Sequence, residues 1–328
     1  MTNKILTLSL LRHGVLYSGG ARYEEFLLDS LSAELKARSI FVKSDKEVFA
    51  RLYKGLANIR LIAEGLKSSK ADVNIVTARL GLGSVVRNLF TRNKVIIVLH
   101  YFDIKDGKGL FLKMYYALLF YTLKRKLSRT AIVCVSPFFE NYFKNVFPYI
   151  PVICIPNLFK NNDYQVYKVD KNISKVILGQ YSPKNDNSGF ELAKKLTLAG
   201  YHCIFFTLDP SQAGKYADYE IKCVPFSAYL QEMASAYCTI AIPYVNEGWN
   251  RIAHESLLVG TPVIGYARGG LGNLLTESNS YIVNNADEAY ELIIQKKVQY
   301  RTSEKFIEKY DAGNSGLFLK PLVDFIML

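Results

Sequence analysis

Short apolar runs alternate with helix-forming stretches along the 328-residue chain, and this alternation constrains the fold more than any other feature. In the stretch 23–35, for example, Tyr23, Leu27 and Leu31 recur at helical spacing. Strands that alternate with helices form parallel sheets, because each helix carries the chain back to the start of the next strand. The expected strands are 5–11, 71–78, 95–100, 131–136 and 152–156 in the first half, and 175–180, 202–208, 237–243 and 262–267 in the second.

Two sets of strands predict an α/β protein with two Rossmann-like domains. A chain of this length is too long for one ordinary core and suits two domains of usual size. The polar stretch 161–172 separates the two sets, so we expect an N-terminal domain at 1–165 and a C-terminal domain at 166–328. The tail from Thr302 onward has the pattern of a helix, a glycine-containing turn and an apolar end. The sequence leaves open whether the last helix packs on the second domain or back on the first.

The excess positive charge of the chain lies in its first half. Residues 1–165 carry 25 Lys and Arg against 12 Asp and Glu, whereas residues 166–328 carry 16 against 17. A field of one sign on one domain indicates an anionic partner that meets this domain. Nucleic acid, an anionic membrane surface and a phosphorylated acceptor all satisfy this condition.

Composition and hydropathy favour a globular, cytoplasmic protein. Half of the residues are hydrophobic and 21% are charged, which is not the composition of a disordered chain. The five cysteines form no C-x-x-C pair and lie mostly in apolar runs, as expected of buried thiols in a reducing compartment. The apolar run 5–11 has no cleavage site after it, and stretches such as 115–123 are about half as long as a bilayer crossing requires.

The stretch 243–275 carries the most information about function. Asn250 is a good N-cap, and we expect a helix over 251–259 that ends at Gly260, with Pro262 preventing its continuation. The expected strand 262–267 then leads into the glycine pair at 269–270.

Two acids, Glu247 and Glu255, lie on the loop and helix of this stretch. Helices and loops that follow parallel strands place such groups at the carboxyl ends of the strands, where open α/β sheets bind ligands. Backbone N–H groups of the turns 248–251 and 269–271 suit phosphate, and glycine lets the backbone approach a diphosphate. Carboxylates bind phosphate poorly and more plausibly accept hydrogen bonds from hydroxyls. Phosphate donors beside hydroxyl acceptors indicate a sugar nucleotide.

The same residues resemble a known enzyme family. Glu247-Gly248-Trp249, Glu255, the run Gly260-Thr261-Pro262-Val263-Ile264 and Gly269-Gly270 resemble the E-G-F-x5-E, G-x-P-V-I and G-G motif of retaining glycosyltransferases of family 4, which have the GT-B architecture. The resemblance implies two Rossmann-like domains whose parallel sheets face an interdomain cleft. It also implies a nucleotide-diphosphate sugar as donor, with no further cofactor.

Other segments resemble the family in the same order along the chain. The glycine loop at Gly19-Gly20 follows the first expected strand, and His100 ends another. The segments 134–143 and 155–157 resemble those that precede the family's hinge. The run 176–180, followed by Lys184, resembles the family's diphosphate clamp, but Gln180 replaces the usual Arg. This loss removes a bidentate phosphate partner, which Arg251 could replace.

The resemblance implies a role for each of these residues. Glu247 would bind hydroxyls of the donor sugar, Glu255 would bind the ribose hydroxyls, and His100 would contact the transferred sugar. Lys184 would stabilise the departing diphosphate, which makes Glu247, His100 and Lys184 the expected catalytic set. The other expected donor-binding residues are Gly248, Trp249, Asn250, Arg251, Gly269, Gly270, Gly19, Gly20, Gln180 and, beside the base within 221–226, Val224 and Pro225. The chain contains no D-x-D motif, so metal-independent transfer is expected.

The basic first half acquires a role in this hypothesis. The stretch 103–129 holds seven Lys and Arg against two Asp, with aromatic and aliphatic residues between them. That pattern suits either a helix packed on the domain with a solvated end or an interfacial helix on anionic lipid at the inner face of the cytoplasmic membrane. Acceptors of the family are often lipid-linked or envelope glycans, so we expect such an acceptor and a role in surface polysaccharide synthesis.

Several other functions stay open at this point. The basic half could bind nucleic acid, although no nucleic-acid-binding motif is present, so this is not favoured. A weakly active or non-catalytic GT-B partner protein, or a sugar-nucleotide epimerase on the same fold, would also fit the motifs. The run from Gly81 to Val86 imitates a dinucleotide-binding loop but lacks its third glycine.

Overall fold

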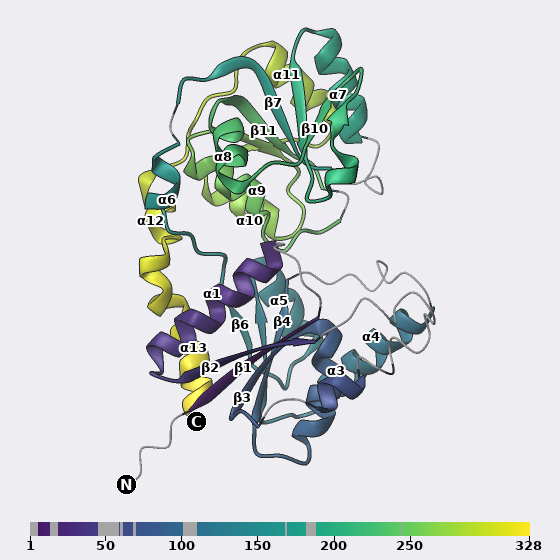
Figure 1. Cartoon of the computed structure of the whole chain (residues 1–328), viewed down its shortest axis with the longest axis vertical. Helices are drawn as coiled ribbons and strands as arrows, with labels where there is room; N and C mark the ends of the chain where they lie inside the picture. The colour runs from purple at the N-terminus through teal and green to yellow at the C-terminus, as the bar shows by residue number, and fades with distance from the viewer. Residues whose placement is uncertain are drawn as a thin grey trace. The chain divides into compact units, whose positions relative to one another are not determined.

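The computed structural model describes residues 6–13, 19–44, 59, 62–67, 70–100, 110–167, 169–181, 188–243 and 245–328. The chain forms two compact units. The first unit comprises Met1–Asn157 together with Ser315–Leu328, and the second comprises Leu158–Asn314. Each unit is an α/β sandwich built on its own sheet (Figure 1).

The first unit contains a parallel sheet in the order β2-β1-β3-β4-β5-β6. Its strands are β1 (Thr7–His13), β2 (Arg38–Ser44), β3 (Val73–Thr77), β4 (Lys94–Leu99), β5 (Thr130–Cys134) and β6 (Val152–Cys154). Its helices are α1 (Gly19–Glu34), α3 (Ala78–Asn88), α4 (Leu110–Leu123), α5 (Pro137–Val146) and α13 (Ser315–Met327).

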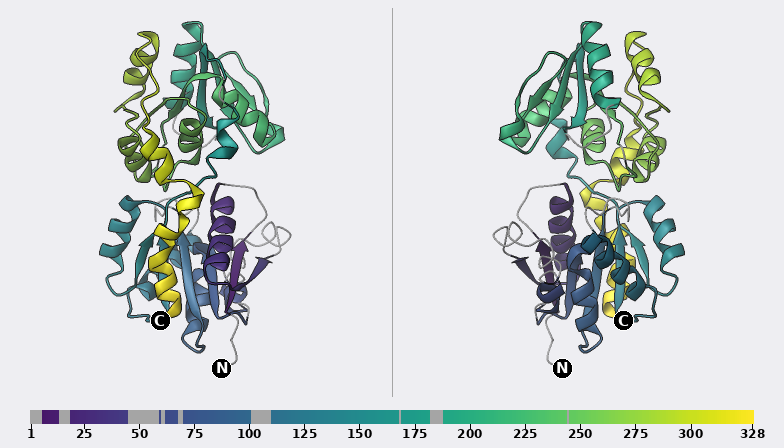
Figure 2. Two further views of the ribbon diagram at one scale, coloured as in Figure 1. Left: turned by 90° about the vertical axis from the view of Figure 1, so that its left-hand side faces the viewer. Right: turned by 90° about the vertical axis from the view of Figure 1, so that its right-hand side faces the viewer.

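Helices cover both faces of this sheet (Figure 2). Alternate strand residues such as Leu11, Val76 and Ile97 pack in one core with α3, α4 and α5. The residues between them, such as Leu10 and Ile75, are equally buried, because α1 and α13 cover the opposite face. Burial on both faces explains why these strands are continuous apolar runs rather than alternating ones.

The glycines of the run 81–86 have a packing role. Helix α3 begins at Ala78, directly after β3, so no glycine loop separates strand from helix. Both Gly81 and Gly83 are buried inside α3, and a Cβ on Gly83 would collide with the carbonyl oxygen of Ile62. The glycines that resemble a dinucleotide-binding loop therefore allow α3 to pack closely against the helical segment 62–66.

The C-terminal helix α13 belongs to the first unit, which answers the question that the sequence left open. It packs against α1 and β6. Lys94 Nζ donates hydrogen bonds to the carbonyl oxygens of Phe325 and Ile326, both at 2.7 Å. This cation therefore satisfies carbonyl groups that have no partner in the last turn of α13.

The second unit contains a sheet in the order β13-β12-β11-β7-β8-β10-β9, in which only the edge pair β10 and β9 is antiparallel. Its strands are β7 (Asn172–Gln180), β8 (His202–Phe206), β9 (Gly214–Lys215), β10 (Glu220–Lys222), β11 (Ala236–Ala241), β12 (Val263–Gly265) and β13 (Tyr281–Ile282). Its helices are α6 (Asn162–Gln165), α7 (Ser188–Leu198), α8 (Phe226–Ala234), α9 (Arg251–Leu258), α10 (Gly270–Glu277), α11 (Ala286–Ile294) and α12 (Glu304–Lys309).

Two layers of helices cover this sheet as well. Helices α7 and α11 pack on one face through Leu192, Leu196 and Ile293. Helices α6, α8 and α9 share a second core that includes Tyr164, Met233 and Leu258. The sheet therefore has the doubly wound form expected from the sequence.

The chain passes between the units at 157/158 rather than at the expected boundary of 165/166. The stretch 161–172 is polar in sequence, yet it contains the short helix α6. Phe159 and Tyr164 are buried and hold this segment on α8 and α9, with their rings in edge contact at 5.8 Å. Two buried aromatic side chains, one just before the polar stretch and one within it, thus assign 158–165 to the second unit.

Candidate functional site

The predicted donor-site residues gather at one edge of the second sheet. Strands β12, β11, β7, β8 and β10 are parallel neighbours, so their carboxyl ends share this edge. Gln180 ends β7, the segment 242–250 follows β11, and Gly269 follows β12. Val224 and Pro225 lie between β10 and α8, where Pro225 is the N-cap of α8. Lys184 lies outside the described residues.

Helix α9 starts and ends where the sequence predicts. The Asn250 side chain accepts a hydrogen bond from the backbone N–H of Ala253 at 2.9 Å, so the predicted N-cap is confirmed. Gly260 has φ +76°, and the N–H of Thr261 donates to the carbonyl of Ser256 at 2.8 Å. This pairing is the expected glycine C-cap of the helix.

The loop that carries Glu247 is fixed against the glycine pair. Glu247 and Gly269 form an isolated parallel bridge, and the N–H of Gly270 donates to the Glu247 carbonyl at 2.7 Å. Gly269 has φ +60° and ψ −137°, and a Cβ there would lie 2.5 Å from the Glu247 carbonyl oxygen. The Gly270 N–H, expected to face a diphosphate, is thus engaged within the protein. The glycine pair positions Glu247.

The Glu247 carboxylate is partly buried and has no hydrogen-bond or ion-pair partner among the described residues. Burial raises the pKa of this carboxyl above its ordinary value. A desolvated carboxylate without a partner is unfavourable in the free protein. A ligand that brings hydroxyl donors to it would relieve that cost.

Glu255, by contrast, is already engaged. Its Oε1 accepts from Arg251 Nη2 at 3.0 Å and its Oε2 accepts from the Tyr229 hydroxyl at 2.8 Å. Burial, followed by the charge of Glu255, raises the pKa of Tyr229 well above its ordinary value. The Arg251 guanidinium also lies 4.5 Å from the centre of the Phe159 ring. Arg251, considered above as a replacement for the missing clamp Arg, is therefore held by Glu255 and Phe159.

Trp249 anchors the same loop from inside the unit. Its indole N–H donates to Nδ1 of His254 at 3.0 Å, and both side chains are buried. Rings of Phe159, Phe306 and Tyr310 surround His254 at centroid distances between 4.3 and 5.5 Å. Burial lowers the pKa of His254 to about 3, so the ring is neutral. The Trp249 ring is thus used inside the unit, and only its backbone is left for the predicted role in donor binding.

We expect His254 to make the protein sensitive to acid. Its pKa is about 3 in the folded state and near 6.5 in the unfolded state, so between these values only the unfolded chain takes up a proton. This contribution to stability is complete above pH 6.5 and is lost as the pH falls toward 3, with a slope of up to ~1.4 kcal/mol per pH unit. Denaturant unfolding from pH 7 to 4.5 measures it.

His254→Gln, which keeps an acceptor for Trp249, should flatten the pH dependence of the unfolding free energy relative to wild type. The matched control is His202→Gln, because His202 is half exposed on β8. Equal slopes for wild type and His254→Gln would show that the buried imidazole does not control acid stability.

An aromatic pair lies at the end of the segment 221–226, which is expected to border the base. Phe226 and Tyr229 stack with centroids 5.7 Å apart and planes 22° from parallel, and Phe226 is partly exposed. Tyr229 is also the residue that donates to Glu255. This arrangement links the start of α8 to α9.

The first unit holds a second group of predicted residues. His100 follows β4, and its Nε2 lies 3.0 Å from the buried carboxylate of Glu24. A Cβ on Gly20 would lie 3.2 Å from the same Nε2. The structure thus brings His100 and Gly20 together, with Gly19 as the first residue of α1.

Sequence reasoning missed Glu24, Tyr229 and the pairing of Trp249 with His254. A signal existed for Glu24, because it is an acid beside Tyr23 on the apolar face of the helix that begins at Gly19. Tyr229 had no such signal, since its contact with Glu255 joins residues on different helices. His254 is close to Trp249 in sequence, but nothing in the spacing shows that the two rings turn inward.

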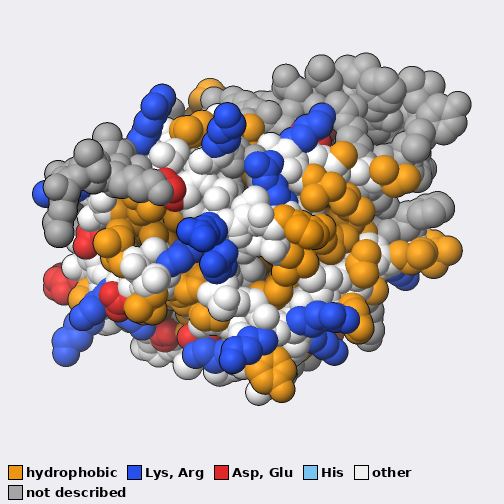
Figure 3. All heavy atoms as spheres, turned by 90° about the horizontal axis from the view of Figure 1, so that it is seen from below, with side chains coloured by type: hydrophobic (Ala, Val, Ile, Leu, Met, Phe, Trp, Pro, Cys, Tyr) orange, Lys and Arg blue, Asp and Glu red, His pale blue; other side chains and the backbone are white. Residues whose placement is uncertain are grey.

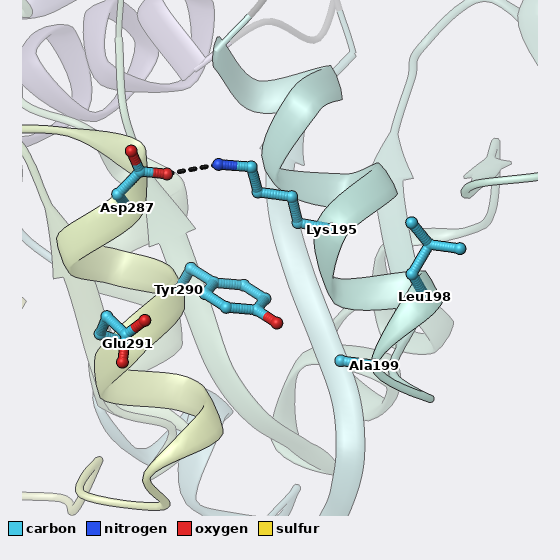
Figure 4. Close-up of a pocket in the computed structure, with 6 residues that line it drawn as sticks. All are labelled: Lys195, Leu198, Ala199, Asp287, Tyr290 and Glu291. Atoms are coloured by element: carbon cyan, nitrogen blue, oxygen red, sulfur yellow. Dashed lines mark hydrogen bonds and ion pairs between the residues drawn. The ribbon is translucent and has the colours of Figure 1, made fainter.

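A shallow surface pocket lies between α7 and α11 in the same unit (Figure 4). Lys195 and Asp287 form an exposed ion pair at 2.5 Å across it. None of the predicted site residues lines this pocket. An exposed ion pair of this kind contributes little to stability or binding.

The two units together have the GT-B fold, so the predicted fold class is confirmed. The similar solved structures share this architecture over almost the whole chain. No protein-family model and no curated protein sequence matches the chain.

Three of the solved structures that are similar to this chain show the extent of the similarity. HepE (Alr3699) from Anabaena, in complex with UDP-glucose, is 13% identical with a TM-score of 0.68 over 97% of this chain and 99% of its own. Sucrose-phosphate synthase from Thermosynechococcus elongatus is 12% identical with a TM-score of 0.71 over 98% and 99%. UDP-GlcNAc 2-epimerase from Methanocaldococcus jannaschii is 12% identical with a TM-score of 0.58 over 98% and 100%.

Proposed function

We propose that this protein is a glycosyltransferase that moves a sugar from a nucleotide-diphosphate donor to a glycan or lipid-linked acceptor. The observation that carries the proposal is the Glu247 carboxylate, which is partly buried, without a partner among the described residues, and fixed by its backbone to Gly269. It lies at the edge of the sheet where α/β folds bind nucleotides. The fold is shared with HepE, whose structure contains UDP-glucose.

Glu247 and Glu255 have different roles in this proposal. Glu247 accepts hydrogen bonds from hydroxyls of the donor sugar, which repays its desolvation. Glu255 holds the ribose hydroxyls. Each oxygen of Glu255 has one partner in the protein, and because a carboxylate has about four acceptor positions it retains capacity for two hydroxyls.

The remaining donor groups have the following roles in this proposal. The turn 248–251 and Lys184 bind the diphosphate, the segment 221–226 borders the base, and His100 contacts the transferred sugar. Transfer retains the anomeric configuration and uses no metal. The family resemblance of the Glu247 to Gly270 block supports retention, and the lack of a D-x-D motif in the sequence supports metal independence.

A panel of nucleotide-diphosphate sugars tests the proposal. Donor binding is read by thermal shift, where a ligand at a hundredfold excess over its Kd should stabilise the protein by about 2.7 kcal/mol. Transfer is read as nucleotide release in the presence of glycan and lipid-linked acceptors, and NMR of the product gives the anomeric configuration. If no nucleotide diphosphate binds, the proposal fails. A donor converted to its isomer without any acceptor would instead indicate an epimerase.

We further propose that the acceptor is met at an anionic membrane surface through α4. Leu110, Met114, Leu118 and Tyr121 recur along one side of this helix and are between 51% and 70% exposed. Tyr115, Leu119 and Leu123 occupy the opposite side and are buried in the core of the first unit. The exposed face is thus apolar along the length of the helix.

Cations accompany this apolar face. Lys113 lies within it, and Lys124, Arg125 and Lys126 follow its end, all exposed. Arg125 also donates to the Tyr121 hydroxyl at 2.9 Å. Figure 3 shows hydrophobic side chains lying among Lys and Arg on one end of the molecule. Exposed apolar side chains with cations among them and at one end match the requirements of an anionic lipid surface. Within the described ranges, every helix is too short or too polar to cross a bilayer.

Vesicle sedimentation tests this surface. Wild type should bind vesicles that contain phosphatidylglycerol and not neutral phosphatidylcholine vesicles, with each cation worth about 1 kcal/mol. Leu118→Glu should weaken binding at least about tenfold, because it removes an apolar contact and adds a negative charge. The matched control is Leu198→Glu, which changes a leucine on α7 of the second unit that is even more exposed, at 80% against 51% for Leu118. Equal loss in both variants, or no binding by wild type, would reject the α4 surface.

A further inference from the structure

His100 packs against the first two turns of α1. Gly20, Tyr23 and Glu24 are spaced three and four residues apart, so all three occupy one face of this helix. Glu24 Oε1 is 3.0 Å from His100 Nε2, and the Tyr23 ring meets the imidazole edge-on with centroids 5.2 Å apart. Three residues of one helix therefore fix a single histidine that follows β4.

The side chains of Tyr23 and Glu24 that contact His100 are both buried. The Tyr23 hydroxyl is buried and donates to the Ile155 carbonyl at 2.8 Å. The Glu24 side chain is only 6% exposed. A Cβ on Gly20 would lie 3.2 Å from Nε2 and 3.3 Å from Cδ2 of His100, so a side chain there would displace the ring. The absence of a side chain at Gly20 thus makes room for the imidazole.

The Glu24 carboxylate determines the protonation pattern of the ring. An ionised carboxylate only accepts hydrogen bonds, so the proton of the neutral imidazole must be on Nε2. Nδ1 then carries the lone pair, and it has no hydrogen-bond partner in the part of the chain that the structure describes. The His100 side chain is 26% exposed, so a ligand can reach the ring.

We propose that Glu24 is a positioning residue that holds His100 as the Nε2–H tautomer, with Nδ1 as the acceptor for a hydroxyl of the transferred sugar. This inference rests on the proposed function and deepens it, because it assigns the recognising atom. Gly20 contributes by leaving space for the ring. Neither residue needs to touch the substrate.

Two measurements test Glu24. Glu24→Gln keeps the shape, but the amide can donate as well as accept, so it no longer dictates the tautomer. We expect kcat to fall about tenfold or more, with a smaller change in KM, because a misplaced proton removes a hydrogen bond made during transfer. Asp29→Asn, an exposed acid on the same helix, is the control and should leave kcat unchanged.

Nitrogen-15 NMR of the imidazole groups reads the tautomer without any donor. The chain has four histidines, and His100→Gln assigns the signal. Wild type should show His100 protonated on Nε2, and Glu24→Gln a mixture of tautomers. A mixture in wild type, or an unchanged tautomer and kcat in Glu24→Gln, would overturn the inference. If wild type transfers no sugar, the proposed function fails instead, and the NMR result still decides the role of Glu24. Gly20→Ala provides a second variant, which should also lower kcat.

Discussion

Glu247→Gln is expected to reduce kcat by about a hundredfold to a thousandfold. This is the scale on which enzymes lose activity when one well-placed charged or polar group at the reacting centre is removed. Gln retains the shape of the side chain but accepts hydroxyl hydrogen bonds only through a neutral oxygen. Steady-state kinetics with the preferred nucleotide sugar would measure the loss. The control is Glu291→Gln, which alters a surface acid of α11 that accepts from Gln295 at 3.0 Å.

The same variant should unfold at a higher temperature than wild type. Burial raises the pKa of Glu247, so the folded state disfavours the charged form. A carboxyl whose pKa is raised in the folded state makes its full contribution to stability below the ordinary pKa. That contribution is lost as the pH rises through the raised pKa of the folded state. Glu247→Gln has no carboxylate at this position, so it does not lose this stability at pH 7. Lost activity together with gained stability is typical of a residue kept for function. Retained activity, or a lower melting temperature, would argue against the role of Glu247.

Gly269→Ala is expected to lower the free energy of unfolding by roughly 3 kcal/mol and to abolish donor binding. Its φ and ψ are unfavourable for a residue with a side chain, a cost of about 1–3 kcal/mol. The new Cβ would also lie 2.5 Å from the Glu247 carbonyl, so the loop must move. Denaturant unfolding and a thermal shift with nucleotide sugar measure the two effects.

Gly260→Ala is the control that measures the cost of a positive φ alone, without a steric clash of the new Cβ. Gly260 also has a positive φ, +76°, but a Cβ there meets nothing within 4 Å. We expect this variant to lose only about 1–2 kcal/mol and to keep donor binding. If both variants behave alike, the contact between Gly269 and the Glu247 loop has no special importance.

The sequence predicted the parts of the structure that depend on local chemistry. The α9 helix, its Asn250 cap and its Gly260 end follow from neighbouring residues, and the structure confirms them. Strands β2, β9, β10 and β13 were not predicted. Three of these are two or three residues long, and β2 lies among charged residues, so pairing with neighbours defines them rather than their own pattern.

The candidate site was predictable in its residues but less in its contacts. The sequence identified Glu247, Glu255 and His100, yet the partners that distinguish them lie far away along the chain. Glu24 is separated from His100 by 76 residues, and Tyr229 from Glu255 by 26. The domain boundary failed for a similar reason, because Phe159 acts through its neighbours in the fold.

The position of α13 has a consequence for the order in which the chain can fold during synthesis. Residues 158–314 are continuous and can complete their unit as soon as they leave the ribosome. The first unit must wait, because the helix that covers α1 and β6 and pairs with Lys94 is translated after residues 158–314. The first unit, whose main part is synthesised before the second unit, is therefore completed after it. Until α13 has been made, the apolar surface that this helix covers stays exposed.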